Sequence, residues 1–132
     1  MILVDTSVLI DLFKGVSNDP ANRMRDILDH QIPFGITSVI YQEVLQGAKS
    51  ENEYALLRDY LSSQSFFHPR DAVKSYSDAA HIYFSCRKKG VTVRSTIDCL
   101  IAQTALEQNL CLLHNDRDFD VMAPIIGLHL YL

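Results

Sequence analysis

MILVDTSVLIDLF, residues 1–13, opens with an apolar run that has the length of a short buried strand. This run, Ile2-Leu3-Val4, ends at the acidic residue Asp5. A polar turn at residues 6–7 comes next, and apolar residues then recur at helical spacing, at Val8, Leu9, Leu12 and Phe13. A strand that passes directly into a helix predicts a fold in which helices connect the strands of a parallel sheet.

The rest of the chain repeats this alternation. Further short apolar runs predict strands at residues 34–37, 65–68, 110–113 and 128–132. Between them, apolar spacing and capping residues predict helices over about 20–29, 38–48, 50–63, 71–90 and 95–108. No linker, repeat or low-complexity segment interrupts the pattern. We therefore expect a single α/β domain over residues 1–132, built as a sandwich of sheet and helices.

Composition excludes several classes of protein. The chain has 132 residues, of which 48% are hydrophobic and 21% are charged, which excludes a disordered chain and suits one domain with its own core. The three cysteines are an odd number without CxxC spacing, which predicts reduced thiols in the cytoplasm. No apolar stretch approaches the roughly 18 residues that cross a bilayer, and the N-terminus lacks the basic start of a secretory signal, so we expect no membrane association.

The net charge bears on nucleic-acid binding. Twelve Lys and Arg residues against sixteen Asp and Glu residues give a formal net charge of −4. A protein that binds nucleic acid by bulk charge is basic, so this chain is not a general coating protein. An enzyme that binds phosphate through metal ions remains compatible with a net charge of −4, because the ions neutralise part of the excess of acidic residues.

Acidic residues follow the predicted strands, where ligand sites form in parallel sheets. Asp5 follows the first strand, and Asp116 follows the strand at 110–113. Asp98 lies in the first turn of the helix that begins after Ser95, and Glu43 lies in the helix after the second strand. Carboxylates drawn together from distant segments repel one another unless a cation joins them. A set with oxygen ligands alone favours Mg²⁺ or Mn²⁺ over Zn²⁺, and such ions support phosphodiester cleavage.

Each of these residues also has an ordinary structural interpretation. Asp5 can cap the first helix, and Asp98 stands where an acid completes a capping box with a serine. Glu43 lies away from the apolar stripe of its helix, as a solvated residue does. Asp116 and Asp118 belong to an Asn-Asp-x-Asp sequence that favours turns. Taken singly, the residues leave both interpretations open.

In their order along the chain, these residues resemble the motifs of PIN-domain ribonucleases. The matching segments are DTSVLID at residues 5–11, Glu43 four residues before Gly47, DCLIA at residues 98–102 and NDRDF at residues 115–119. The resemblance extends over nearly the whole chain. Its size and its start are similar to those of the VapC-type toxins of toxin–antitoxin pairs.

The resemblance implies a fold, an activity and partners. It implies a parallel sheet of about five strands between helices, an acidic pocket that holds Mg²⁺ or Mn²⁺, and metal-dependent endonucleolytic cleavage of RNA, with transfer or ribosomal RNA as the substrate class. By position, the catalytic and metal-binding acids would be Asp5, Glu43, Asp98 and Asp116, with Asp118 as a further metal ligand. It also implies a cognate antitoxin that neutralises the enzyme, and a homodimer.

Two other functions stay open at this point. A metal-dependent phosphatase that forms an aspartyl-phosphate carries a second acid two residues after the first, and here that residue is Ser7. A non-catalytic α/β module that binds RNA or protein needs none of these acids. Arg94 and Arg117 stand close in sequence to the acids and can either meet phosphate or balance their charge. The aromatic residues Tyr76, Tyr83 and Phe84 suit the core or a dimer contact.

Overall fold

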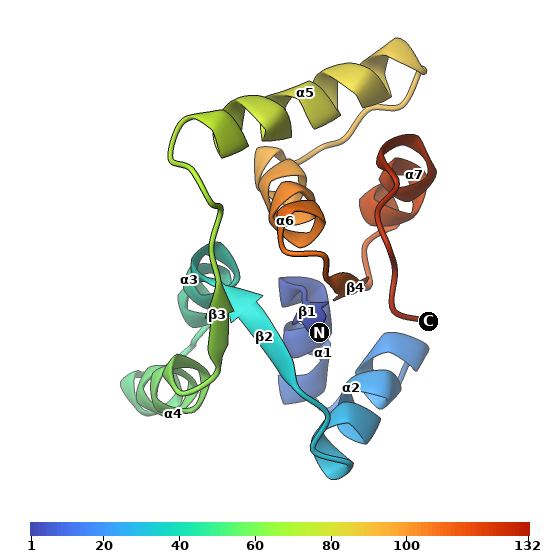
Figure 1. Cartoon of the computed structure of the whole chain (residues 1–132). Coiled ribbons are helices and arrows are strands. Elements are labelled where there is room, and N and C mark those ends of the chain that lie inside the picture. The colour runs from blue at the N-terminus through green and yellow to red at the C-terminus, as the bar shows by residue number, and fades with distance from the viewer.

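The computed structural model describes residues 1–132 as an alternation of short strands and helices, with the helices flanking the sheet (Figure 1). None of the helices combines the length and the apolarity of a membrane span. The elements are β1 (Ile2–Val4), α1 (Thr6–Phe13), α2 (Asp19–Asp29), β2 (Phe34–Thr37), α3 (Ser38–Gln46), α4 (Glu51–Ser62), β3 (Ser65–Phe67), α5 (Lys74–Lys88), α6 (Thr96–Glu107), β4 (Cys111–Leu113) and α7 (Arg117–Ile126).

The strands form one parallel sheet in the order β3-β2-β1-β4. Ile2 of β1 pairs with Phe34 on one side and with Cys111 on the other, so the N-terminal strand lies inside the sheet. Every residue of β1 is buried, as is usual for an apolar strand between two neighbours with helices on both faces. The predicted α/β fold is confirmed.

The sheet has four strands rather than about five, because residues 128–132 do not form a regular strand. The N–H of Leu128 donates to the carbonyl of Ala123 and so closes the end of α7. Beyond it, Leu130 makes only an isolated parallel bridge with Leu112. The apolar residues of this segment cover the edge of β4 without extending the ladder.

Side-chain caps explain where the helices begin. A polar side chain accepts a backbone N–H from the first turn of every helix except α5, which satisfies donors that have no partner within the helix. The segment before α5 is closed instead by Asp71, whose carboxylate accepts the N–H groups of Val73 and Lys74. The capping residues are Asp5, Asn18, Thr37, Ser50, Ser95 and Asp116.

Three helix N-termini meet at the carboxyl edge of the sheet. α1 and α7 follow β1 and β4 almost directly, and the N–H of Asp5 donates to the carbonyl of Leu113, which joins the two strand ends. α6 leads into the start of β4, so its own first turn lies at the opposite end, beside the carboxyl edge. α7 is a helix that the sequence patterns above did not predict. Its N-cap, Asp116, and its second residue, Asp118, both lie at this edge.

Candidate functional site

Asp98, Asp116 and Asp118 form an acidic cluster at the carboxyl edge of the sheet. Each offers one carboxylate oxygen, and these three oxygens lie within 4.8 Å of one another. Asp118 is buried and the other two are half-buried. The cluster therefore joins the first turn of α6 to the first turn of α7, two segments that are far apart in the sequence.

Asp5 stands beside this cluster and is buried, with 4% of its surface exposed. Its carboxylate accepts the N–H of Ser7 at 3.1 Å and the Ser7 hydroxyl at 2.6 Å, so Asp5 caps α1. Burial raises the pKa of the Asp5 carboxyl above its ordinary value, the Ser7 hydrogen bonds oppose the rise, and the charge of Asp116 adds to it. Asp5 thus caps α1 and also adds its negative charge to that of the acidic cluster.

The negative charge of the neighbouring acids also affects the pKa of Asp98. Burial raises the pKa of its carboxyl to about 7, and the negative charges of Asp5 and Asp116 add to the rise. Burial is the larger cause of this rise and the neighbouring carboxylates add to it, so both disfavour the charged form of Asp98 when no cation is bound. A divalent cation would offset this negative charge, and an oxygen-only ligand set suits Mg²⁺ or Mn²⁺. The residues present therefore fit such an ion.

The capping interpretation of Asp98 holds only in part. The Ser95 hydroxyl oxygen accepts the N–H of Asp98 at 3.4 Å, which is one half of a capping box. The reciprocal bond, from the Ser95 N–H to the Asp98 carboxylate, is not formed. The carboxylate instead faces the acids of α7, where carboxylate oxygens of Asp98, Asp116 and Asp118 lie within 4.8 Å of one another.

Glu43 is held at the same edge but outside the acidic cluster. Its Oε1 accepts the Thr6 hydroxyl at 2.7 Å, and the side chain is half-buried against the start of α1. Thr6 directly follows Asp5, so this bond ties α3 to the segment that carries the first acid. The structure thus groups Asp98, Asp116 and Asp118 and places Asp5 beside them. Glu43 of α3 stays outside this cluster, bound to Thr6.

A second network fixes the two strand ends relative to each other. The Ser7 hydroxyl donates to Asp5 and accepts the N–H of Asn115 at 2.9 Å. The Asn115 side chain in turn donates to Asp11 at 3.0 Å. These bonds lock the turn after β4 onto α1. They explain why residues 5–11 and 115–118 act as one structural unit.

His114 positions Asp116, a role that sequence reasoning missed. Its Nδ1 accepts the backbone N–H of Asp116 at 3.0 Å, so the neutral ring carries its proton on Nε2, which lies 3.3 Å from Asp120. The ring is buried, with 8% of the side chain exposed, and packs on Phe119. The only signal in the sequence is a histidine two residues before an acid at a strand end.

We expect His114→Asn to preserve Mn²⁺ binding and His114→Gln to weaken it about tenfold or more, by analogy with residues that orient metal ligands. The Asn side-chain oxygen can take the place of Nδ1 and accept the Asp116 N–H, whereas Gln places its amide near the former Nε2. Titration of Mn²⁺ into the two purified variants measures the difference. Equal affinities in both variants would contradict the positioning role.

Arg94 contacts the cluster from the loop before α6. Its backbone N–H donates to Asp118 at 3.0 Å and its Nε lies 3.4 Å from the same oxygen, Oδ2. Its Nη2 lies 3.7 Å from Asp116. The guanidinium therefore offsets part of the acidic charge, one of the two roles considered for it.

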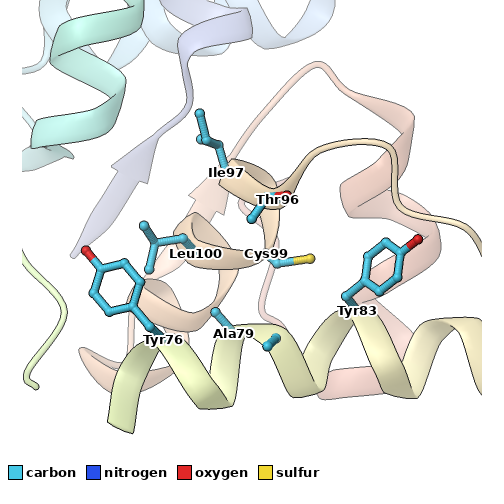
Figure 2. A pocket seen from close by; sticks show the side chains of 8 residues that line it. Tyr76, Ala79, Tyr83, Thr96, Ile97, Cys99 and Leu100 are labelled. Carbon is cyan, nitrogen blue, oxygen red and sulfur yellow. The ribbon is translucent and has the colours of Figure 1, made fainter. Parts of the chain in front are cut away.

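An apolar hollow of about 360 Å³ lies behind Asp98, between α5 and α6. Figure 2 shows Tyr76 and Tyr83 on α5 at the two ends of this hollow, with Cys99 and Leu100 of α6 between them. Burial raises the pKa of Cys99 to about 11, so the thiol beside Asp98 stays protonated and is neither a nucleophile nor a metal ligand at neutral pH. The neighbours of Asp98 on this side of α6 thus serve packing.

The comparison with known families decides the assignment. The sequence profile described as "PIN domain" matches residues 2–124. This chain belongs to the PIN domain family. Among curated relatives, ribonuclease VapC11 of Mycobacterium tuberculosis is 34% identical over 129 residues, which cover 97% of this PIN domain and 96% of the relative. A VapC ribonuclease of Mycobacterium bovis matches equally well.

Solved structures agree on the PIN fold. A chain of VapBC2 from Rickettsia felis, bound to a DNA fragment from its promoter, superposes with a TM-score of 0.73 at 20% identity, and the match covers 99% of this chain and 98% of that one. A chain of a toxin–antitoxin complex from Klebsiella pneumoniae reaches a TM-score of 0.64 at 27% identity, covering 97% of this chain and 95% of that one. The fold predicted from the resemblance is confirmed.

Proposed function

We propose that this PIN domain is an endoribonuclease that hydrolyses RNA phosphodiester bonds with Mg²⁺ or Mn²⁺, and that it is the toxin of a toxin–antitoxin pair. The observation that carries the proposal is the acidic cluster: oxygens of Asp98, Asp116 and Asp118 converge within 4.8 Å at the carboxyl edge of a parallel sheet. The curated relatives that are named ribonucleases support it, since they match almost end to end.

Each acid has a proposed role. Asp98, Asp116 and Asp118 would hold the divalent ion, with Asp5 completing the site from the end of β1. Glu43, whose Oε1 accepts the hydroxyl of Thr6 next to Asp5, would orient a metal-bound water or a second ion. When bound, a divalent ion positions a water molecule for attack and stabilises the leaving oxygen. The Ser7 and His114 hydrogen bonds keep the carboxylates in place before the ion and the RNA arrive.

This function is favoured over the two alternatives. The position two residues after Asp5 is Ser7, whose hydroxyl is committed to the Asp5 carboxylate and to the Asn115 N–H, so it does not supply the second acid of an aspartyl-phosphate phosphatase. A non-catalytic binding module would have no need to keep Asp98 at a pKa near 7 beside two other acids. The substrate class we propose is transfer or ribosomal RNA.

A cognate antitoxin is the partner that this site requires. Both structural neighbours described above come from toxin–antitoxin complexes. A cationic side chain of the antitoxin can enter the acidic cluster, because an arginine guanidinium pairs with carboxylates through two parallel hydrogen bonds. Such pairing would place a positive charge where the metal ion otherwise binds.

We also propose that the protein is a homodimer in the cytoplasm. The apolar hollow between α5 and α6 (Figure 2) offers a surface that a second copy can cover. The aromatic rings of Tyr76 and Phe84 on α5 are also exposed. All three cysteines are free thiols, which suits a reducing compartment.

The test of the proposed function is RNA cleavage by the purified protein, freed of any antitoxin, with total transfer RNA and ribosomal RNA as substrates. We expect cleavage with Mg²⁺ or Mn²⁺ and none in excess EDTA. The carboxylates alone provide no cation to activate the water or to stabilise the leaving oxygen. Restoring the metal after EDTA should restore the activity. Cleavage that is undiminished in EDTA would contradict the proposal, as would release of phosphate from small phosphomonoesters without any cleavage of RNA.

A further inference from the structure

A polar hollow, separate from the apolar one between α5 and α6, adjoins the acidic cluster on the side of the loop before α6. It has a volume of about 450 Å³ and is lined by Gly90, Val91, Thr92, Arg94, Arg117, Asp118 and Val121. Asp118 therefore has one side in the cluster and the other side in this hollow. A chain of RNA whose scissile phosphate lies at the cluster would have a neighbouring phosphate within reach of the hollow.

Arg94 is arranged so that its charge points out of the protein. Its backbone N–H and its Nε are held by one oxygen of Asp118, at 3.0 Å and 3.4 Å. The side chain of Asp118 is 9% exposed, whereas that of Arg94 is 74% exposed. The two terminal amino groups make no hydrogen bond, since Nη2 lies 3.7 Å from the nearest carboxylate oxygen, on Asp116. Asp118 thus holds the Nε of the guanidinium, whereas its two terminal amino groups are free to bind a ligand.

Arg117 lines the same hollow from the first position of α7. Its side chain is exposed and makes neither a hydrogen bond nor an ion pair. Only the Nε of the exposed Arg94 guanidinium is held by Asp118, and Arg117 makes no side-chain contact of this kind, so folding alone does not account for two arginines here. The chain as a whole carries a net charge of −4, which makes a pair of available guanidinium groups beside the acids a local exception.

We propose that Arg94 and Arg117 bind a backbone phosphate of the RNA strand, adjacent to the phosphate that is cleaved. A guanidinium fork matches two phosphate oxygens in geometry and charge. The contact carries no base specificity; it sets the register of the strand over the acidic cluster. The inference rests on the proposed function for the identity of the strand, but it concerns a surface distinct from the metal ligands.

The salt dependence of RNA binding tests this surface. The probe is a fluorescein-labelled single-stranded RNA of 12 nucleotides, and binding is followed by anisotropy between about 25 and 200 mM salt. Asp98→Asn serves as the parent protein so that the RNA stays intact. Each phosphate contact contributes roughly 0.7 to the slope of log K against log salt concentration for a single strand. Loss of the one phosphate contact in Arg94→Gln/Arg117→Gln should therefore reduce the magnitude of the slope by about 0.7.

Two further variants keep the result interpretable. Arg117→Gln alone breaks no contact in the fold and should reduce the magnitude of the slope in the same direction, by less than the double variant does. Arg25→Gln/Arg58→Gln removes the same total charge from α2 and α4, on other faces of the molecule (Figure 1), and should leave the slope unchanged. Thermal melts of every variant confirm that it is folded.

The possible outcomes test the phosphate contact and the proposed ribonuclease function separately. An unchanged slope in the hollow variants, an equal fall in the Arg25/Arg58 control, or no binding by the parent protein in 25 mM salt would each overturn the phosphate contact. If the slope falls as expected while the wild-type protein cleaves no RNA with any metal, the surface stands and the ribonuclease proposal fails. If cleavage is observed while the slope is unchanged, the reverse holds.

Discussion

Asp98→Asn should slow RNA cleavage by this PIN domain roughly 100-fold or more while the protein stays folded. The substitution keeps the shape of the side chain and removes one charged oxygen ligand from a cluster whose three oxygens lie within 4.8 Å. Loss of one electrostatic contact to the reacting phosphate typically costs 10²–10³ in rate, and weaker metal binding adds to the loss. Initial rates with saturating Mn²⁺ measure the effect.

The matched control is Asp29→Asn. Asp29 is an exposed acid at the end of α2 that makes no side-chain hydrogen bond or ion pair, so the same chemical change there should leave the rate within about twofold of the wild type. An Asp98→Asn protein that retains more than a tenth of the wild-type rate would show that Asp98 is not part of the catalytic centre. A normal circular dichroism spectrum is required of both variants.

The same substitution should stabilise the metal-free protein at alkaline pH. Asp98 has a pKa of about 7 in the folded protein, against an ordinary value of 3.8. The folded state therefore binds the proton more tightly than the unfolded state does, and the resulting stability is complete below about pH 4 and is lost as the pH rises through 7. Asn cannot lose this proton. At pH 8, without metal, the free energy of unfolding of Asp98→Asn should exceed that of the wild type by about 1 kcal/mol, a figure that allows for screening by solvent.

The helix dipole and the binding of Mn²⁺ also change the stability difference between Asp98→Asn and the wild type. Loss of a negative charge from the first turn of α6 costs roughly 0.3–1 kcal/mol at pH 8 through the helix dipole, which reduces the gain there. At pH 5 Asp98 still holds its proton in the folded protein, so the advantage of the variant should vanish. Mn²⁺ at 100 times its dissociation constant should stabilise the wild type by about 2.7 kcal/mol and the variant much less. Thermal melts at pH 5 and pH 8, with and without Mn²⁺, give all these quantities. A variant that is less stable at pH 8 and gains as much from Mn²⁺ would show that Asp98 acts only at the helix start.

Local patterns in the sequence were sufficient to place most of the acids. The apolar run that ends at Asp5 identifies β1, and the serine cap before α6 places Asp98 in a first turn. Parallel topology then brings the ends of β1 and β4 to one edge, so the meeting of Asp5 with Asp116 follows from chain order. These are short-range signals combined with a general rule of sheet architecture.

The contacts that fix the site depend on the folded structure and were not predictable in the same way. His114 holds Asp116 through a backbone N–H, which leaves no side-chain pattern in the sequence, and the bond between Arg94 and Asp118 spans 24 residues. α7 was missed because the Asn-Asp-x-Asp segment also favours a turn, and because Pro124 lies inside the helix. The strand expected at 128–132 was reduced to a bridge because Leu128 completes the end of α7.

The most direct test of a divalent-metal centre at this edge of the sheet is an anomalous scattering map from crystals of the protein grown with Mn²⁺. We predict a manganese peak within roughly 2–2.5 Å of carboxylate oxygens from α6 and α7, that is, from Asp98 and at least one of Asp116 and Asp118. The peak should be absent from crystals of Asp98→Asn grown in the same solution. A map with no manganese at these carboxylates, or with manganese held elsewhere in a protein that cleaves RNA, would contradict the account.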